Sequence, residues 1–237
     1  MDKEKGLIKI DSIKSIMRFL QQPSLKIAEA LTGILASDPN DLKLSAGRLV
    51  QACIKSKFLH QLGKELKEYR KKGKIKEDYF ATSSNRASLY ELLKFIDEEV
   101  PDEERFKAMK SIFLTSISID TSKEDEILAY EIMQICKKLD SADILVLKAV
   151  YDIAKGGGSK LNGANLATKH ASEWLNIVAH KIGHKIPSLV EISEEKLINL
   201  KLISGRMYAD KSGVDTSPHF RLTQLGFKLC EFITKYE

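Results

Sequence analysis

The feature that most constrains the fold of this chain is the helical spacing of its apolar residues. Residues 11–20 place four of them at positions i, i+3, i+4 and i+7, which is one face of an amphipathic helix. The segments 123–139 and 141–154 repeat this spacing with further apolar residues. Only 13 glycines and 5 prolines occur in 237 residues, which disfavours long loops and strand-rich architectures. The sequence therefore predicts a mostly α-helical protein.

Composition limits the compartment and the class of protein. Hydrophobic residues make up 43% and charged residues 30%, which is an ordinary globular balance. No apolar run approaches the ~18 residues of a membrane span, and residues 1–9 lack the apolar core of a signal peptide. Three widely spaced cysteines form no disulfide or zinc pattern. We expect no transmembrane segment and a cytoplasmic location.

Two domains are expected, a helical bundle over residues 1–140 and a second domain over 141–237. Within the bundle we expect one helix ending near Cys53 and a separate one ending near Lys72, which Gly63 weakens or divides. Residues 80–87 are predicted to be a loop. Ser88 and Glu91 have the spacing of a capping box, which predicts that the next helix begins there.

The pattern changes after Ser141. Three helical segments are followed by an alternating stretch around DKSGVD, which predicts a β-hairpin, and by a final helix from Leu225 to Tyr236. Helix, helix, helix, hairpin, helix is the order of elements in a winged-helix domain. Thr223 stands where it can cap the last helix.

The stretch KLINLKLISGRMY followed by RLTQLGFKLCEFI resembles the end of a winged-helix domain. The residues that carry the resemblance are Leu197, Leu200, Leu202, Ile203, Leu222, Thr223 and Gly226. The ending LTxxGxxxC is also similar to that of Abi-alpha type bacterial abortive-infection proteins. This second resemblance implies a role in phage resistance.

A winged helix implies that its third helix, here residues 188–200, reads DNA. Its expected non-core positions are Glu191, Glu194, Glu195, Lys196 and Asn199. Three carboxylates make a poor surface for phosphates, which favours a protein-contact role for this helix. The predicted wing retains three cations that leave backbone contact open, namely Arg206, Lys211 and Arg221.

A stronger electrostatic feature spans residues 55–76. Nine basic residues and only two acids give this segment a net charge of +7. Lys64, Lys67 and Lys71 have the spacing of one helical face, and apolar residues occupy another. A basic amphipathic helix suits nucleic acid, an anionic membrane surface or an acidic partner. The alternative is a solvated face compensated by the acidic segments 97–99 and 102–104. The predicted anion-binding residues here are Lys64, Lys67, Arg70, Lys71, Lys72 and Lys74.

The remaining motifs give no catalytic or metal site. His180 and His184 have a spacing that can bind zinc, but the glutamate of a metalloprotease helix is missing between them. No serine or cysteine stands in a nucleophile pattern. We expect no catalytic residue, no cofactor and no metal.

Together these features predict a non-enzymatic cytosolic interaction or sensor protein, with a role in bacterial phage defence and a basic helix for an anionic partner. A protein partner is expected, and nucleic acid and a homodimer remain open. One alternative is a winged-helix transcriptional regulator, which would bind DNA as a two-fold dimer with steep salt dependence. Another is an effector enzyme with an unrecognised site.

Overall fold

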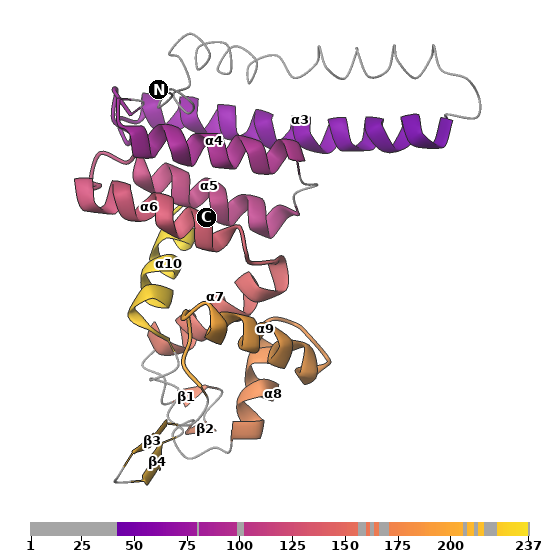
Figure 1. Ribbon diagram of the computed structural model, residues 1–237, viewed down its shortest axis with the longest axis vertical. Coiled ribbons are helices and arrows are strands. Elements are labelled where there is room, and N and C mark those ends of the chain that lie inside the picture. The colour runs from indigo at the N-terminus through magenta and orange to yellow at the C-terminus, as the bar shows by residue number, and fades with distance from the viewer. Residues whose placement is uncertain are drawn as a thin grey trace, which may run out of the picture. The chain divides into compact units, whose positions relative to one another are not determined.

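The computed structural model describes a mostly helical protein (Figure 1), which confirms the predicted helical class, while the winged-helix architecture of residues 141–237 stays a prediction. The residues that it describes are 42–79, 81–98, 102–155, 160–161, 164–165, 171–205, 208–210, 213–215 and 222–236. The amphipathic segment 11–20 lies outside them. Eight helices, α3 to α10, are found within these ranges.

The chain divides into two compact units. The first comprises Met1–Phe106 and Phe113–Met133, and the second comprises Lys107–Ile112 and Gln134–Glu237. A short stretch of α5 therefore belongs with the C-terminal residues. The predicted domain boundary between 140 and 141 remains a prediction.

The first unit is built from four helices around an apolar core. They are α3 (Leu42–Lys71), α4 (Ser83–Glu98), α5 (Glu103–Ser116) and α6 (Lys123–Cys136). In Figure 1, α4 runs back along the C-terminal part of α3. The Phe58 ring of α3 meets the Phe106 ring of α5 with centroids 4.4 Å apart. Buried side chains contributed by these helices include Leu62, Leu66, Leu92, Phe95, Phe113, Ile132 and Met133.

The prediction of two separate helices before residue 72 was wrong, because α3 is a single helix of 30 residues that runs through Gly63. A glycine inside a helix costs about 1 kcal/mol relative to alanine. Tertiary packing offsets that cost, since Phe58, Leu62 and Leu66 are all buried on either side of it. The helix ends where Gly73 adopts a φ of 61° and the Lys74 N–H donates to the Tyr69 carbonyl at 2.9 Å, a Schellman arrangement.

The predicted start of α4 was also wrong. The helix begins at Ser83, and the Thr82 hydroxyl accepts a hydrogen bond from the Asn85 N–H at 3.3 Å. Ser88 is fully buried in the interior of this helix and does not cap it. The apolar residues Leu89 and Leu92 extend the buried face, so packing carries the helix further toward its N-terminus than the capping pattern indicated.

The second unit centres on α7 (Ser141–Lys155), which contacts three other helices. These are α8 (Ala171–Lys181), α9 (Pro187–Asn199) and α10 (Gln224–Thr234), and α8 also packs on α9. Their buried residues include Leu147, Val150, Val178, Val190, Leu197, Leu229 and Ile233.

Two short antiparallel ribbons complete the described part of this unit. Strand β1 (Lys160–Leu161) pairs with β2 (Ala164–Asn165), and β3 (Tyr208–Asp210) pairs with β4 (Gly213–Asp215). The β3–β4 pair lies in the segment for which a hairpin was predicted, with Ala209 opposite Val214. Its identification as the wing of a winged helix remains a prediction.

The Leu222–Gly226 element has a clear physical role. The Thr223 side chain accepts from the Gly226 N–H at 3.0 Å and caps α10, which confirms the predicted cap. The Thr223 hydroxyl also donates to the Lys201 carbonyl at 2.7 Å. A Cβ at Gly226 would lie 2.0 Å from the Leu202 carbonyl oxygen, so this position admits only glycine. The element therefore fixes the start of α10 against the chain that follows α9.

Candidate polyanion-binding face

The exposed side of α3 carries a regular row of cationic side chains. Lys57, Lys64, Lys67 and Lys71 are all exposed, and the exposed His60 lies among them. These five positions follow the spacing i, i+3, i+7, i+10 and i+14, which keeps them on one side of a helix. The four lysines are called the basic face below.

The basic face points away from the core of the first unit. At 100° per residue its centre lies about 180° around the helix from Phe58, Leu62 and Leu66. Those three side chains are buried, so the helix has a core side and a solvent side. A rise of 1.5 Å per residue places Lys57 and Lys71 about 21 Å apart along the axis.

The charges of this face are not neutralised within the described residues. None of its four lysines forms an ion pair there. Glu68 pairs with Lys72 at 2.5 Å, and the hydrogen bond from Lys72 lowers the pKa of the Glu68 carboxyl.

Compensation by the acidic segments 97–99 and 102–104 does not reach the basic face in the described structure. Of the residues in the 55–76 run, Lys55 pairs with one of these acids, Asp97, at 3.3 Å. The Asp102 carboxylate accepts from the Arg105 N–H at 2.9 Å and caps α5. Compensation by these acidic segments therefore accounts for Lys55 and leaves the four lysines of the face without an ion pair, while Lys64 contributes to the lowered pKa of the nearby Glu68.

The other predicted cations of this segment lie at its flanks. Arg70 is exposed and opposes the rise in the pKa of Tyr79 that burial of that phenol causes. Lys72 is held by Glu68. Lys74 follows the end of the helix and lies 5.9 Å from the centre of the Tyr69 ring.

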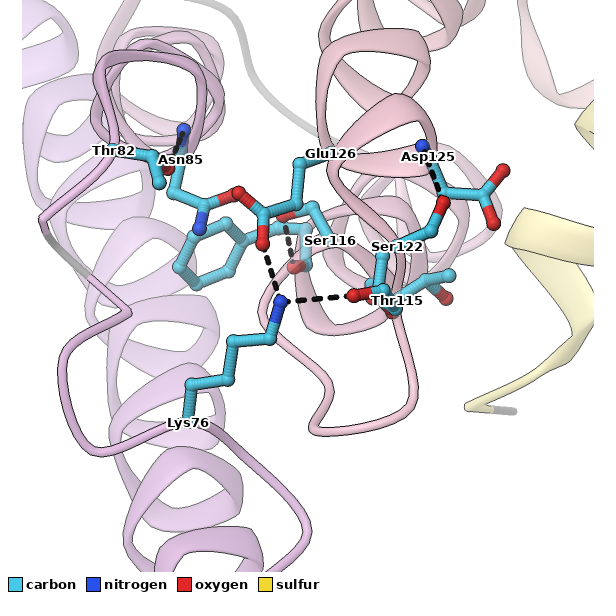
Figure 2. A network of polar contacts seen from close by, with 10 residues as sticks. Lys76, Thr82, Asn85, Thr115, Ser116, Ser122, Asp125 and Glu126 are labelled. Atoms are coloured by element: carbon cyan, nitrogen blue, oxygen red, sulfur yellow. Dashed lines mark hydrogen bonds and ion pairs between the residues drawn. The ribbon is translucent and has the colours of Figure 1, made fainter.

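Lys76 is drawn away from solvent into a polar network (Figure 2). Its ammonium group pairs with Glu126 and donates to the Thr121 carbonyl at 2.9 Å. Its backbone N–H donates to the Ile117 carbonyl at 3.0 Å, and the Ile119 N–H donates to the Lys74 carbonyl at 3.1 Å. These bonds fix the chain that follows α3, so Lys76 serves the fold.

Lys57 and His60 were missed as members of the face. The signal was present, because the spacing of Lys64, Lys67 and Lys71 continues backward through both of them. The expectation of separate helices, with Gly63 as a point of division, concealed this continuity. A single straight helix through Gly63 joins the two halves of the row.

The exposed surface of α9 differs from the prediction. Glu194 was expected at a non-core position, but it is buried, because its carboxylate accepts a hydrogen bond from the Trp174 indole at 2.6 Å. Lys196 is held at 2.5 Å by the buried carboxylate of Asp143 and at 3.1 Å by Asp140. The first turn of α7, together with Asp140 just before it, thereby neutralises the one lysine of α9.

Apolar and acidic side chains remain on the outside of α9. Ile186, Leu189 and Ile192 are 55%, 44% and 65% exposed, spaced three residues apart at and after the start of the helix. Glu191 and Glu195 are exposed beside them. Such a surface opposes contact with phosphates and is typical of a protein contact.

Other candidate groups form no site within the described residues. No cluster of three or more His, Cys, Asp or Glu that could hold a metal occurs among them. Burial raises the pKa of the Cys230 thiol well above its ordinary value, so this cysteine is not a reactive nucleophile. Arg206, Lys211 and Arg221 lie outside the described residues. No helix in the described ranges is long and apolar enough to cross a membrane.

Comparisons with known proteins give no functional assignment, so the function is argued from the residues described above. No family model matches the chain, and no curated protein or solved structure matches it.

Proposed function

We propose that this chain is a non-enzymatic interaction protein whose α3 helix binds a polyanion through its basic face. The observation that carries the proposal is the row of Lys57, Lys64, Lys67 and Lys71, exposed and without an ion pair in the described structure. A polyanion that contacts these lysines releases its condensed counterions, which drives association. The rigid helix holds the cations in position, so little side-chain ordering beyond the lysines themselves is required.

A protein partner contacts a different surface in this proposal. Ile186, Leu189 and Ile192 offer an apolar strip, and the carboxylate of Glu195 lies at its edge. The matching partner surface has apolar side chains rimmed by lysine or arginine, because the charges of the two rims must be complementary. The same acids disfavour insertion of α9 into a DNA groove, so the transcriptional-regulator alternative gains no support from this helix.

The first test compares two variants of equal net charge. In one, the four lysines of the basic face are changed to glutamine. In the matched control, four exposed lysines elsewhere are changed to glutamine, namely Lys123, Lys138, Lys185 and Lys235. Binding of a fluorescent heparin oligosaccharide to the full chain is measured by anisotropy.

We expect the basic-face variant to lose at least tenfold in heparin affinity and the control to lose much less. Equal losses in the two variants would show that net charge, and not this face, governs binding, and would overturn the proposal. Circular dichroism of both variants checks that the helices remain folded.

The cellular setting is part of the same proposal. The resemblance of the LTxxGxxxC ending to Abi-alpha proteins supports a role in phage defence in the bacterial cytoplasm. The plating efficiency of phage on cells that express the wild type, the basic-face variant or the matched control tests it. Protection that is equal in all three strains, or absent from all three, would contradict a defence role that depends on this face.

A further inference from the structure

We infer that the polyanion bound by the basic face is the phosphate backbone of a double-stranded nucleic acid, contacted without reading its bases. This inference rests on the proposed function and adds the class of ligand. Three features of the described residues lead to it. They are the burial of the apolar side of α3, the residue types on the face, and the arrangement of its cations along one helix.

The burial of the apolar side disfavours a membrane surface. A basic amphipathic helix binds a bilayer by placing its apolar side among the acyl chains. Here the apolar side of α3 is used by the core, since Phe58 is 4% exposed, Leu62 0% and Leu66 2%. Among the α3 side chains that the structure describes, residues 54–71, the lysine side is the exposed one, so this part of the helix would contact a membrane by charge alone.

The residue types disfavour single strands and base recognition. Sequence-tolerant binding of single strands uses aromatic side chains on which bases stack. Phe58 is buried against Phe106, and Tyr69 projects about 160° around the helix from the centre of the face. Adenine edges in the major groove are read by asparagine or glutamine, and guanine edges by arginine or lysine. The face presents lysine and one histidine, so it lacks the planar amide and guanidinium groups that make paired hydrogen bonds to a base.

The geometry favours a rigid duplex. The four lysines lie within an arc of about 80° along about 21 Å of one helix, which corresponds to about six base pairs at 3.4 Å each. A duplex presents phosphates along a similarly stiff line, whereas a flexible strand would have to be ordered to follow it. The opposite side of α3 packs on α4, so the duplex would be contacted through the lysine side of the helix.

The number of lysines predicts the salt dependence. Four phosphate contacts give a slope of log K against log salt of about −3.6 for a duplex, from 0.9 per contact. Each lysine that is removed lowers the magnitude of the slope by about 0.9. The slope therefore counts the contacts made by the face.

The experiment measures anisotropy of the full chain with labelled 16-mer probes across a salt series. The probes are two duplex DNAs of unrelated sequence, one duplex RNA and one single strand. Vesicles of phosphatidylserine and phosphatidylcholine are tested by sedimentation. The variant Lys67→Gln/Lys71→Gln is compared with Lys123→Gln/Lys138→Gln, which removes the same charge from other exposed positions.

We expect both DNA duplexes to bind alike and at least fivefold tighter than the single strand. We also expect the slope to fall by about 1.8 in Lys67→Gln/Lys71→Gln and to stay unchanged in the control, from 0.9 per lysine. Comparison of the two kinds of duplex shows whether DNA or RNA is preferred.

Two outcomes would overturn the inference while the proposed function stands. One is tighter binding to the single strand or to vesicles than to any duplex, with heparin binding still lost in the basic-face variant. The other is duplex binding whose slope does not respond to Lys67 and Lys71. If heparin binding is also insensitive to the face, the proposed function fails together with the inference.

Discussion

The indole Nε1 of Trp174 donates a hydrogen bond of 2.6 Å to the Glu194 carboxylate, and both side chains are buried. This bond joins α8 to α9 in the second unit. It removes one carboxylate from the exposed surface of α9, and it gives the single tryptophan of the chain a defined polar partner. The fluorescence of Trp174 therefore reports on this contact.

Changing Glu194 to alanine should destabilise the protein by about 1–3 kcal/mol, because the buried indole N–H loses its acceptor. Glu194→Gln keeps an acceptor oxygen at the same distance from the backbone and should cost less. Urea unfolding followed by Trp174 emission measures both variants. Equal stabilities for the two variants would show that the hydrogen bond does not hold α8 against α9.

Gly226→Ala should destabilise the second unit by about 3 kcal/mol, near the upper end of the range for overpacking. The added Cβ would meet the Leu202 carbonyl oxygen at 2.0 Å, and the backbone would have to shift. Gln224→Ala in the same turn is the control, because Gln224 is exposed. Unfolding of both variants is compared by Trp174 emission. A Gly226→Ala protein as stable as the control would contradict the close approach.

Lys196→Met should destabilise the second unit by about 2 kcal/mol at pH 7. The substitution leaves the buried carboxylate of Asp143 without its cation. The value lies below that for a fully buried pair, because the Lys196 side chain is 39% exposed and water screens it.

The cluster of Asp140, Asp143 and Lys196 predicts a dependence of stability on pH. Burial acts to raise the pKa of Asp140, but hydrogen bonds from Asp143 and Lys196 outweigh it, so the pKa lies below its ordinary 3.8. A carboxyl with a lowered pKa in the folded state stabilises the fold above its unfolded-state pKa and loses this contribution as pH falls. We expect stability to fall below about pH 4, and to fall less steeply in Lys196→Met.

Lys196 itself contributes at the opposite end of the pH range. Burial acts to lower its pKa, but the hydrogen bonds to Asp143 and Asp140 raise it above the ordinary 10.5. Its contribution is therefore present at neutral pH and lost only as pH rises through this raised pKa. The acid end of this dependence, which is expected from Asp140, is tested by urea unfolding of wild type and Lys196→Met at pH 3, 5 and 7. If the urea midpoints of the two proteins fall by the same amount as pH is lowered, Lys196 does not contribute to the lowered pKa of Asp140, which would contradict the prediction.

Lys76→Met should destabilise the first unit by about 3 kcal/mol, because it leaves the Glu126 carboxylate buried without its cation. The double variant Lys76→Met/Glu126→Leu should recover a large part of that loss, since no buried charge remains. Thermal unfolding by circular dichroism compares them, and Lys71→Met at the exposed face is the control. Additive losses in the double variant would show that the two side chains act independently.

Local sequence patterns predicted the helical class and much of the candidate site. Lys64, Lys67 and Lys71 lie on one exposed side of α3 because helical spacing is set by the backbone geometry of consecutive residues. The Thr223 cap was also predictable, because a capping hydroxyl bonds to the backbone only three residues onward. Patterns within one or two turns need no knowledge of the rest of the fold.

Contacts between distant segments escaped prediction. The continuity of α3 through Gly63 depends on side chains that pack against α4 and α5, and Lys76 leaves the cationic run because Glu126 lies 50 residues further along the chain. Glu194 is buried because Trp174, 20 residues earlier, supplies the donor that its carboxylate requires.

By itself, then, the sequence determined the helical class and which cations share one side of α3, since both follow from the period of the helix. Only the tertiary structure decided which of these charges stay available. A charge such as that of Glu126 or Glu194 can be buried only where a distant partner satisfies it. The lysines at 57, 64, 67 and 71 remain exposed because the packing of the first unit covers the opposite side of their helix.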